Sequence, residues 1–189
     1  MKFRFAIYMM FILSSLVNLF GQQNGEEDLN NMRKMTQVTE EHKLFEKFTG
    51  EWRQNFIGYT GEGDQVGSGY IKNDVILGGR YIESVSSIIV SGVQINGKII
   101  IGYNTKQENY FLFGIDDATN FSISAKGQFD PQKNQLEFNG SDYILSLKKE
   151  MPFKILITFE RENKYTYQMY FGEGKSQKLL FEYACIKNN

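Results

Sequence analysis

The chain has 189 residues, of which 41% are hydrophobic and 15% aromatic, and this composition excludes a disordered chain and a coiled coil. The 21 basic and 22 acidic residues give a formal net charge of -1, which offers no electrostatic reason to expect a nucleic acid as partner. Eighteen glycines, 16 phenylalanines and 11 tyrosines, beside only two prolines, are typical of an all-β domain with many turns.

The first 21 residues are predicted to be a secretory signal peptide. Lys2 and Arg4 precede an apolar run over 5–13, and a weaker stretch behind this run ends at Gly21. A membrane anchor needs about 20 strongly apolar residues. We therefore expect cleavage after Gly21 or Gln22, and a secreted or periplasmic protein that has no membrane contact once the signal is removed.

The folded domain is expected over 39–189, behind a flexible tether at 22–38 that is polar and lacks an apolar period. A short helix opens the domain, because Thr39 is a favourable N-cap and Gly50 a favourable stop. Three apolar side chains share one face of this helix, namely Leu44, Phe45 and Phe48.

Behind Gly50 the chain consists of about ten short β-branched or aromatic segments that are bounded by turn residues. The predicted strands are 51–59, 67–77, 80–90, 98–103, 109–116, 121–129, 135–147, 153–161, 164–171 and 178–187. Hairpin-length connections predict antiparallel pairing of sequence neighbours, and so many strands close into a barrel or divide into two packed sheets. Apolar and small polar side chains occur on both faces of 80–90, which favours a barrel wall with one covered face and one face toward a cavity.

Few side chains are available for catalysis or metal binding. One histidine, His42, and one cysteine, Cys185, exclude zinc sites built from several such residues. We expect His42 to be solvated on the helix beside Glu41, and Cys185 to be a small buried hydrophobe. Asp116 and Asp117 are adjacent, so on a strand they would point to opposite faces, and they are better explained as turn caps. No catalytic residue, metal or cofactor is predicted.

Four short motifs occur in an order that is known from one protein family. They are HKLFEKFTGEW from His42, LGGRYIE from Leu77, NGKIIIGYN from Asn96 and YFLFGID from Tyr110. In this order they resemble the domain of unknown function 1579 family (DUF1579), and the resemblance covers about 40–187. It implies an antiparallel, up-and-down, calycin-like β-barrel, related in shape to lipocalins, fatty-acid-binding proteins and nitrobindin. It leaves the activity open.

Gly50-Glu51-Trp52 also resembles the Gly-x-Trp sequence that opens lipocalin barrels. There the tryptophan closes one end of the barrel and commonly stacks beneath a basic side chain of the final strand. The resemblance thus implies structural roles for Gly50 and Trp52, with Lys187 or Lys178 as the basic residue.

Two positions depart from the family pattern, since Asn104 stands in place of an aspartate and Phe113 in place of a tryptophan. Either change alters a turn or a wall of the lumen. Haem binding of the nitrobindin kind requires a histidine near the final strands, and the stretch around Tyr183 has none.

The aromatic residues on both strand faces favour a barrel that binds a small, largely apolar molecule. The candidate ligand-binding residues are Arg80, Glu83, Tyr103, Phe113 and Tyr167. A second hypothesis is a structural or interaction module with a filled interior. A third, placed last, is an enzyme that uses carboxylates such as Glu83 and Asp116. The volume and lining of the barrel interior distinguish the three.

Overall fold

A computed structural model describes residues 25–33 and 35–188, in one unit that ends at Gln37 and a second that begins at Val38. The predicted signal peptide lies outside the described residues. In the first unit residues 25–33 and 35 are helical and exposed, where the sequence predicts a tether without regular structure. Acidic side chains at the helix start favour this helix through its dipole. Among the described residues, no helix has the length and hydropathy needed to cross a membrane.

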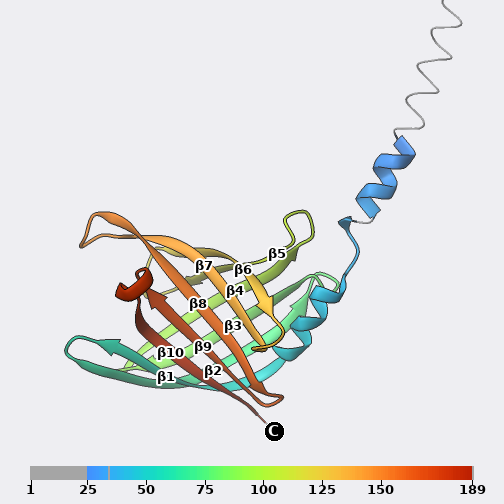
Figure 1. The fold of residues 1–189 in the computed structure, drawn as a ribbon. Helices are drawn as coiled ribbons and strands as arrows, with labels where there is room; N and C mark the ends of the chain where they lie inside the picture. Colours follow the sequence, from blue (N-terminus) through green and yellow to red (C-terminus); the bar gives the residue numbers. More distant parts are fainter. Residues whose placement is uncertain (1–24, 34, 189) are drawn as a thin grey trace, which may run out of the picture. The chain divides into compact units, whose positions relative to one another are not determined.

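The second unit is a closed barrel of ten antiparallel strands in up-and-down order, in which the first strand pairs with the last (Figure 1). The strands are β1 (Gly50–Thr60), β2 (Gly63–Ile76), β3 (Tyr81–Val90), β4 (Val93–Asn104), β5 (Asn109–Asp116), β6 (Ser122–Asp130), β7 (Gln135–Ile144), β8 (Lys149–Arg161), β9 (Lys164–Phe171) and β10 (Lys178–Lys187). The predicted all-β barrel is confirmed. Three strands begin four or five residues earlier than predicted, because the segments 63–66, 93–97 and 149–152 pair within the ladder.

A 3₁₀ helix, η1 (Glu40–Lys47), lies at one end of the barrel (Figure 1). Thr39 is its N-cap, as predicted, and Leu44, Phe45 and Phe48 are buried. We call this the closed end, where the turns at 77–80, 105–108, 131–134 and 162–163 also lie. The opposite, open end carries the turns at 61–62, 91–92, 117–121 and 145–148 and the short helix η2 (Gly174–Ser176).

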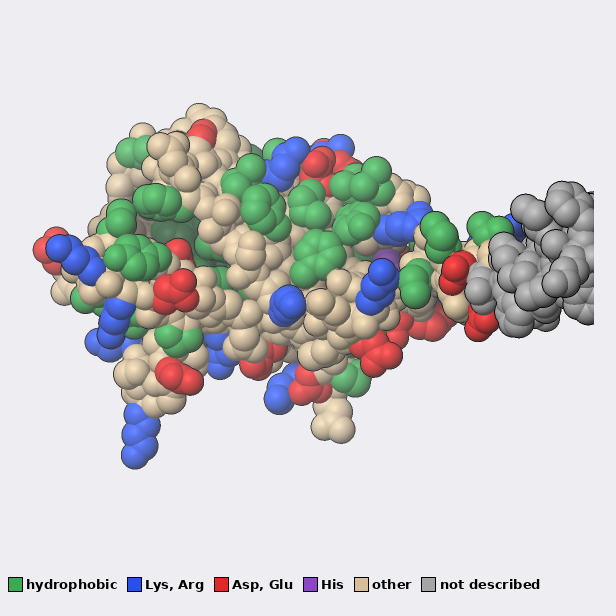
Figure 2. Space-filling view, turned by 90° about the horizontal axis from the view of Figure 1, so that it is seen from above, with side chains coloured by type: hydrophobic (Ala, Val, Ile, Leu, Met, Phe, Trp, Pro, Cys, Tyr) green, Lys and Arg blue, Asp and Glu red, His purple; other side chains and the backbone are tan. Residues whose placement is uncertain are grey.

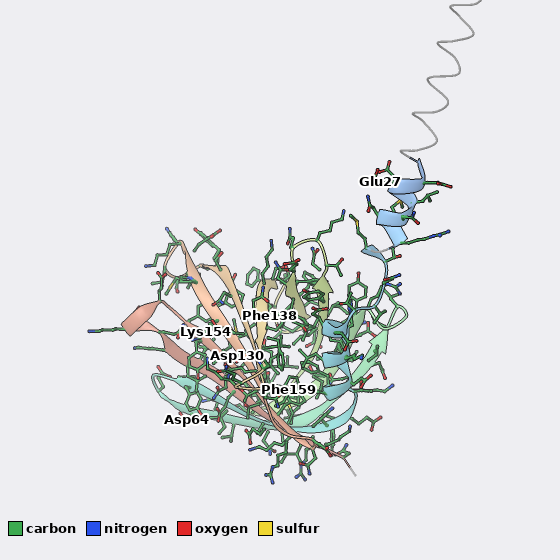
Figure 3. All side chains as sticks on the ribbon, turned by 45° about the vertical axis from the view of Figure 1, so that its right-hand side comes forward. Glu27, Asp64, Asp130, Phe138, Lys154 and Phe159 are labelled. Carbon is green, nitrogen blue, oxygen red and sulfur yellow. The ribbon has the colours of Figure 1, made fainter. Side chains whose placement is uncertain are left out.

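The hydrophobic core fills the closed half of the barrel and extends along β8 toward the open end, where the buried Phe153 pairs with Phe171 at the end of β9. Its largest buried side chains come from η1 and from six of the strands, and they include Phe45, Trp52, Ile82, Ile101, Leu112, Phe138, Phe153 and Ile157. Figure 3 shows Phe138 and Phe159 among densely packed side chains inside the barrel, whereas Asp64 lies in the hairpin between β1 and β2 at the open end.

Two glycines, Gly127 and Gly140, allow the rings of Phe138 and Phe153 to lie flat against the barrel wall. A Cβ atom on Gly127 would stand 2.6 Å from Cδ1 of Phe138, and one on Gly140 would stand 2.5 Å from Cζ of Phe153. Since real Cβ atoms do not approach other atoms so closely, any larger residue would displace a buried ring.

Candidate functional site in the barrel lumen

Trp52 seals the closed end of the lumen. Its side chain is 1% exposed, and its Nε1 donates a 2.7 Å hydrogen bond to the carbonyl oxygen of Phe48. The Nζ of Lys187 lies 5.3 Å from the centroid of the indole, so Lys187 is the basic residue of the final strand that covers the tryptophan. Gly50 has a φ of +119°, and a Cβ there would stand 3.0 Å from Cε of Lys187. These contacts give Gly50 and Trp52 structural positions, away from the open end.

A group of buried polar side chains, which we call the amide cluster, adjoins the indole and consists of Gln54, Asn73, Tyr165 and Cys185. The Nδ2 of Asn73 donates to the carbonyl oxygen of Phe48 (3.0 Å) and to the phenol oxygen of Tyr165 (3.2 Å). The Nε2 of Gln54 donates to Sγ of Cys185 at 3.7 Å.

Two acceptors of the amide cluster have no partner. Gln54 is 4% exposed and Asn73 0% exposed, and among the described residues Oε1 of Gln54 and Oδ1 of Asn73 accept no hydrogen bond. A buried polar atom without a partner costs about 1–3 kcal/mol. A water molecule or a ligand with a hydrogen-bond donor would remove this cost.

The open half of the lumen has an aromatic wall formed by Phe56, Tyr167, Phe181 and Tyr183. The ring centroid of Phe56 lies 5.1 Å from that of Tyr183, and the rings of Tyr167 and Phe181 are parallel at 6.2 Å. Tyr167 is buried, but Phe56, Phe181 and Tyr183 are only partly buried although they face inward. Solvent therefore reaches the wall from the open end.

Across the barrel, β3, β4 and β5 carry four small inward residues, which we call the small-residue wall, namely Ser84, Ser86, Gly97 and Gly114. Larger side chains flank them, because Ile99 pairs with Ser84 and Gly114, and Cγ1 of Ile123 would stand 3.0 Å from a Cβ on Gly114. The three atoms nearest to a Cβ on Gly97 would be Ser86 Oγ (3.1 Å), the carbonyl oxygen of Ile115 (3.5 Å) and Cβ of Asp116 (3.9 Å), so the nearest contacts of this position are small groups. Figure 2 shows the upper face hollowed at the left, toward the open end, with hydrophobic side chains around and inside the hollow. An aromatic wall that faces a small-residue wall is suited to a flat, apolar ligand.

The ladder between β6 and β7 is broken toward the open end. It runs from Asp130 paired with Gln135 to Ala125 paired with Gly140 and ends there. Beyond this point Ser122–Ser124 pair only with β5, and Ser141–Ile144 pair only with β8. Phe121 and Tyr143, which stand beside this break, are both exposed. At this break the two neighbouring strands can separate without breaking a hydrogen bond between them, and the ladder between β1 and β10 also ends before the open end, at Gly58 paired with Phe181.

The structure does not bring the five predicted ligand-binding residues together. Tyr167 belongs to the aromatic wall. Tyr103 faces inward at the closed end, where its ring lies 5.0 Å from that of Tyr110. Arg80 lies in the turn between β2 and β3, also at the closed end, and its Nη1 donates to the carbonyl oxygen of Leu77 at 3.0 Å.

Glu83 and Phe113 lie on the outer face of the barrel, which corrects their predicted place in the lumen. Glu83 forms a 2.8 Å ion pair with Lys98, and Phe113 is 41% exposed. Their chain neighbours Ile82 and Leu112 point inward and are buried in the core. Because successive strand residues alternate between the two faces, Glu83 and Phe113 must point outward.

The amide cluster was missed in the sequence, although a signal for it exists. Gln54 stands between Trp52 and Phe56 on the inward face of β1, and Asn73 follows Ile71 on the inward face of β2. A polar residue at a position where the alternation requires an apolar one marks either a functional site or a partnered polar group.

His42 is buried, which corrects the expectation that it is solvated. It is 6% exposed, and its ring lies 5.7 Å from Phe45 and 5.8 Å from Tyr103. Its Nδ1 accepts a 3.0 Å hydrogen bond from the backbone N–H of Thr39, which turns the imidazole back over the start of η1. Burial lowers the pKa of His42, since it disfavours the imidazolium, although the charge of Glu41 acts in the opposite direction.

The lowered pKa of His42 predicts a pH-dependent stability. The folded protein binds this proton less readily than the unfolded chain, whose histidine titrates near 6.5. The free energy of unfolding should thus be constant above this pH and should decline as the pH falls below it. Urea unfolding between about pH 5.5 and 8 measures the decline. The His42→Gln variant should lack the histidine part of it, and equal pH dependence in both proteins would contradict this assignment.

Cys185 is fully buried, and burial raises the pKa of its thiol to about 11. The predicted buried thiol is confirmed. Since the thiolate is the reactive form, Cys185 should react with a disulfide reagent such as 5,5′-dithiobis(2-nitrobenzoate) only after unfolding. Release of one equivalent of thionitrobenzoate in denaturant, and almost none in buffer, is the expected result. Fast reaction of the native protein would show that the region around Cys185 opens to solvent without unfolding.

The two adjacent aspartates are turn caps, as expected. Asp116 Oδ1 accepts from the backbone N–H of Ala118 (3.0 Å) and of Thr119 (2.9 Å), and Asp117 accepts from the backbone N–H of Asn96 at 2.7 Å. In the described part of the chain no three His, Cys, Asp or Glu side chains are grouped as they would be for a metal ion.

A family model described as "Protein of unknown function (DUF1579)" matches residues 37–182. This range contains η1, the first nine strands and half of β10. No curated protein matches the chain.

Proposed function

This chain belongs to the DUF1579 family, and from the lumen of its barrel we propose that it is an exported protein that binds a small, largely apolar molecule. The ligand would lie in the open half of the lumen, with the aromatic wall on one side and the small-residue wall on the other. Export is part of this proposal because of the N-terminal signal pattern.

The observation that carries the proposal is the incomplete burial of the aromatic wall. In a barrel filled by its own side chains, inward rings at mid-strand would be as buried as Trp52. Phe56, Phe181 and Tyr183 instead remain partly exposed, although each contacts another ring. Covering these rings with an apolar ligand removes their surface from water, which is favourable by about 25 cal/mol per Å².

The two other hypotheses have less support. A filled interior does not account for solvent contact at the aromatic wall. The carboxylate hypothesis needs two acids that converge, but Glu83 is paired with Lys98 on the outer face and Asp116 caps a turn.

Naphthalene titration tests the proposal, since naphthalene has the flat apolar shape that the two walls would hold. Its binding to the purified protein should be saturable when followed by calorimetry. The Gly97→Leu variant fills the space beside the small-residue wall. It should bind naphthalene at least about tenfold more weakly than the wild type. Phe113→Ala, which removes an aromatic ring from the outer face, is the matched control and should bind like wild type. Absence of naphthalene binding, or equal binding by Gly97→Leu, would overturn the proposal.

A further inference from the structure

We propose that the ligand of this barrel carries a hydroxyl or N–H group at the inner end of an apolar body, and that Oε1 of Gln54 accepts a hydrogen bond from it. The inference rests on the proposed function, because it assumes that the lumen holds a ligand. It adds the chemical class of the ligand and the residue that selects it.

In the amide cluster each amide nitrogen donates a hydrogen bond, whereas neither amide oxygen accepts one from the described residues. Both bonds that Asn73 donates come from Nδ2, and the bond that Gln54 donates to Cys185 comes from Nε2. The carbonyl oxygens of both amides are buried and without a partner. A ligand atom that bonds to either of these oxygens must be a donor.

Gln54 is the member of the cluster that an entering ligand would reach first. Along the inward face of β1 it lies one step deeper than Phe56, and on β10 its neighbour Cys185 lies one step deeper than Tyr183. On the other side it pairs with Gly69, over which the buried side chain of Ile88 lies. Asn73 pairs with Gly50 and is closer to the closed end of the barrel. A ligand whose body lies along the aromatic wall thus has its inner end above Gln54.

The charges around the lumen disfavour an anionic end group. Neither wall nor the amide cluster contains Lys, Arg or His. Asp116 stands two residues beyond Gly114 on the same face of β5, so a negative charge lies at the rim of the small-residue wall. Burial raises the pKa of Tyr183 to about 12, with a smaller contribution from Asp116, so this phenol is neutral at pH 7. A carboxylate would lose its hydration and find no cation in return.

The phenols of Tyr167 and Tyr183 do not decide between ligand classes, because a phenol both donates and accepts. The discrimination comes from the amide oxygen of Gln54, which only accepts. A site built around an acceptor without a partner strongly prefers a ligand that supplies the missing donor over the same ligand without it.

Three probes with one common body test this inference, namely naphthalene, 2-naphthol and 2-naphthoate at pH 7. Wild-type protein should bind 2-naphthol about tenfold more tightly than naphthalene, and 2-naphthoate more weakly than naphthalene. In Gln54→Leu the preference for 2-naphthol should fall to within about twofold, with naphthalene affinity retained. The control is Gln168→Leu, because Gln168 lies on the outer face of β9 and bonds to Glu182. It should keep the full preference.

The outcomes separate this inference from the proposed function. If naphthalene binds but 2-naphthol is not preferred, the barrel binds apolar ligands and the assignment to Gln54 is wrong. Retention of the preference in Gln54→Leu, or tightest binding of 2-naphthoate, likewise overturns the inference alone. If none of the three probes binds, the proposed function fails too. The wild-type comparison decides the matter even if Gln54→Leu does not fold.

Discussion

The Trp52→Ala variant should lose about 3–5 kcal/mol of its free energy of unfolding, enough to unfold much of the protein. The indole is 1% exposed and packs edge-on against Tyr165 with ring centroids 4.8 Å apart. Its removal leaves a cavity at the closed end and deprives the carbonyl oxygen of Phe48 of the bond from Nε1. Because Asn73 donates to the same carbonyl, the amide cluster would lose its support as well.

Urea unfolding followed by far-ultraviolet circular dichroism measures this loss. Trp52→Phe keeps a buried ring and gives up the hydrogen bond, so it should lose less than Trp52→Ala. Phe113→Ala on the outer face should change the free energy of unfolding by less than about 1 kcal/mol. A similarly small change in Trp52→Ala would show that the indole does not hold the closed end together.

The barrel could be predicted because its causes are local. Turn residues recur between short segments of β-branched and aromatic residues, and hairpin-length turns leave antiparallel neighbours as the only pairing. The starts of β2 and β4 were missed, since Gly63 and Gly97 look like turn residues but pair across the ladder with Thr60 and Ser86. Whether a glycine ends a strand or continues it depends on the partner strand.

The site was less predictable, because alternation gives two faces and does not say which one is inside. In β3 both faces carry apolar residues, with Ile82 inward and Val85 and Ile89 exposed. The choice is made by the closure of the barrel around Trp52, which is a long-range event. Burial of His42 has the same origin, since besides its neighbour Phe45 in η1 it depends on contact with Tyr103 on β4.

The break in the β6–β7 ladder could not be read from the sequence at all, and it leads to the second large effect. If the ligand enters between Ser122–Ser124 and Ser141–Ile144, holding these segments together should slow binding. Continuation of the ladder beyond Ala125 and Gly140 would next place Ser124 opposite Ser141, and both side chains are exposed on the outer face. We expect that bridging Ser124→Cys and Ser141→Cys with a short bis-maleimide lowers the association rate of naphthalene at least about tenfold, because entry then requires the barrel mouth alone.

The dissociation rate should fall by a similar factor, since the bridge blocks one path in both directions and leaves the walls that hold the ligand unchanged. Stopped-flow mixing measures both rates, and Cys185 does not interfere because it is fully buried. The matched control is the same bridge between Phe113→Cys and Ser124→Cys, two positions that already pair across β5 and β6. That bridge closes nothing and should leave both rates unchanged. Unchanged rates in the first bridged protein would mean that ligands pass only through the open end, between the turns, and that the break serves another purpose.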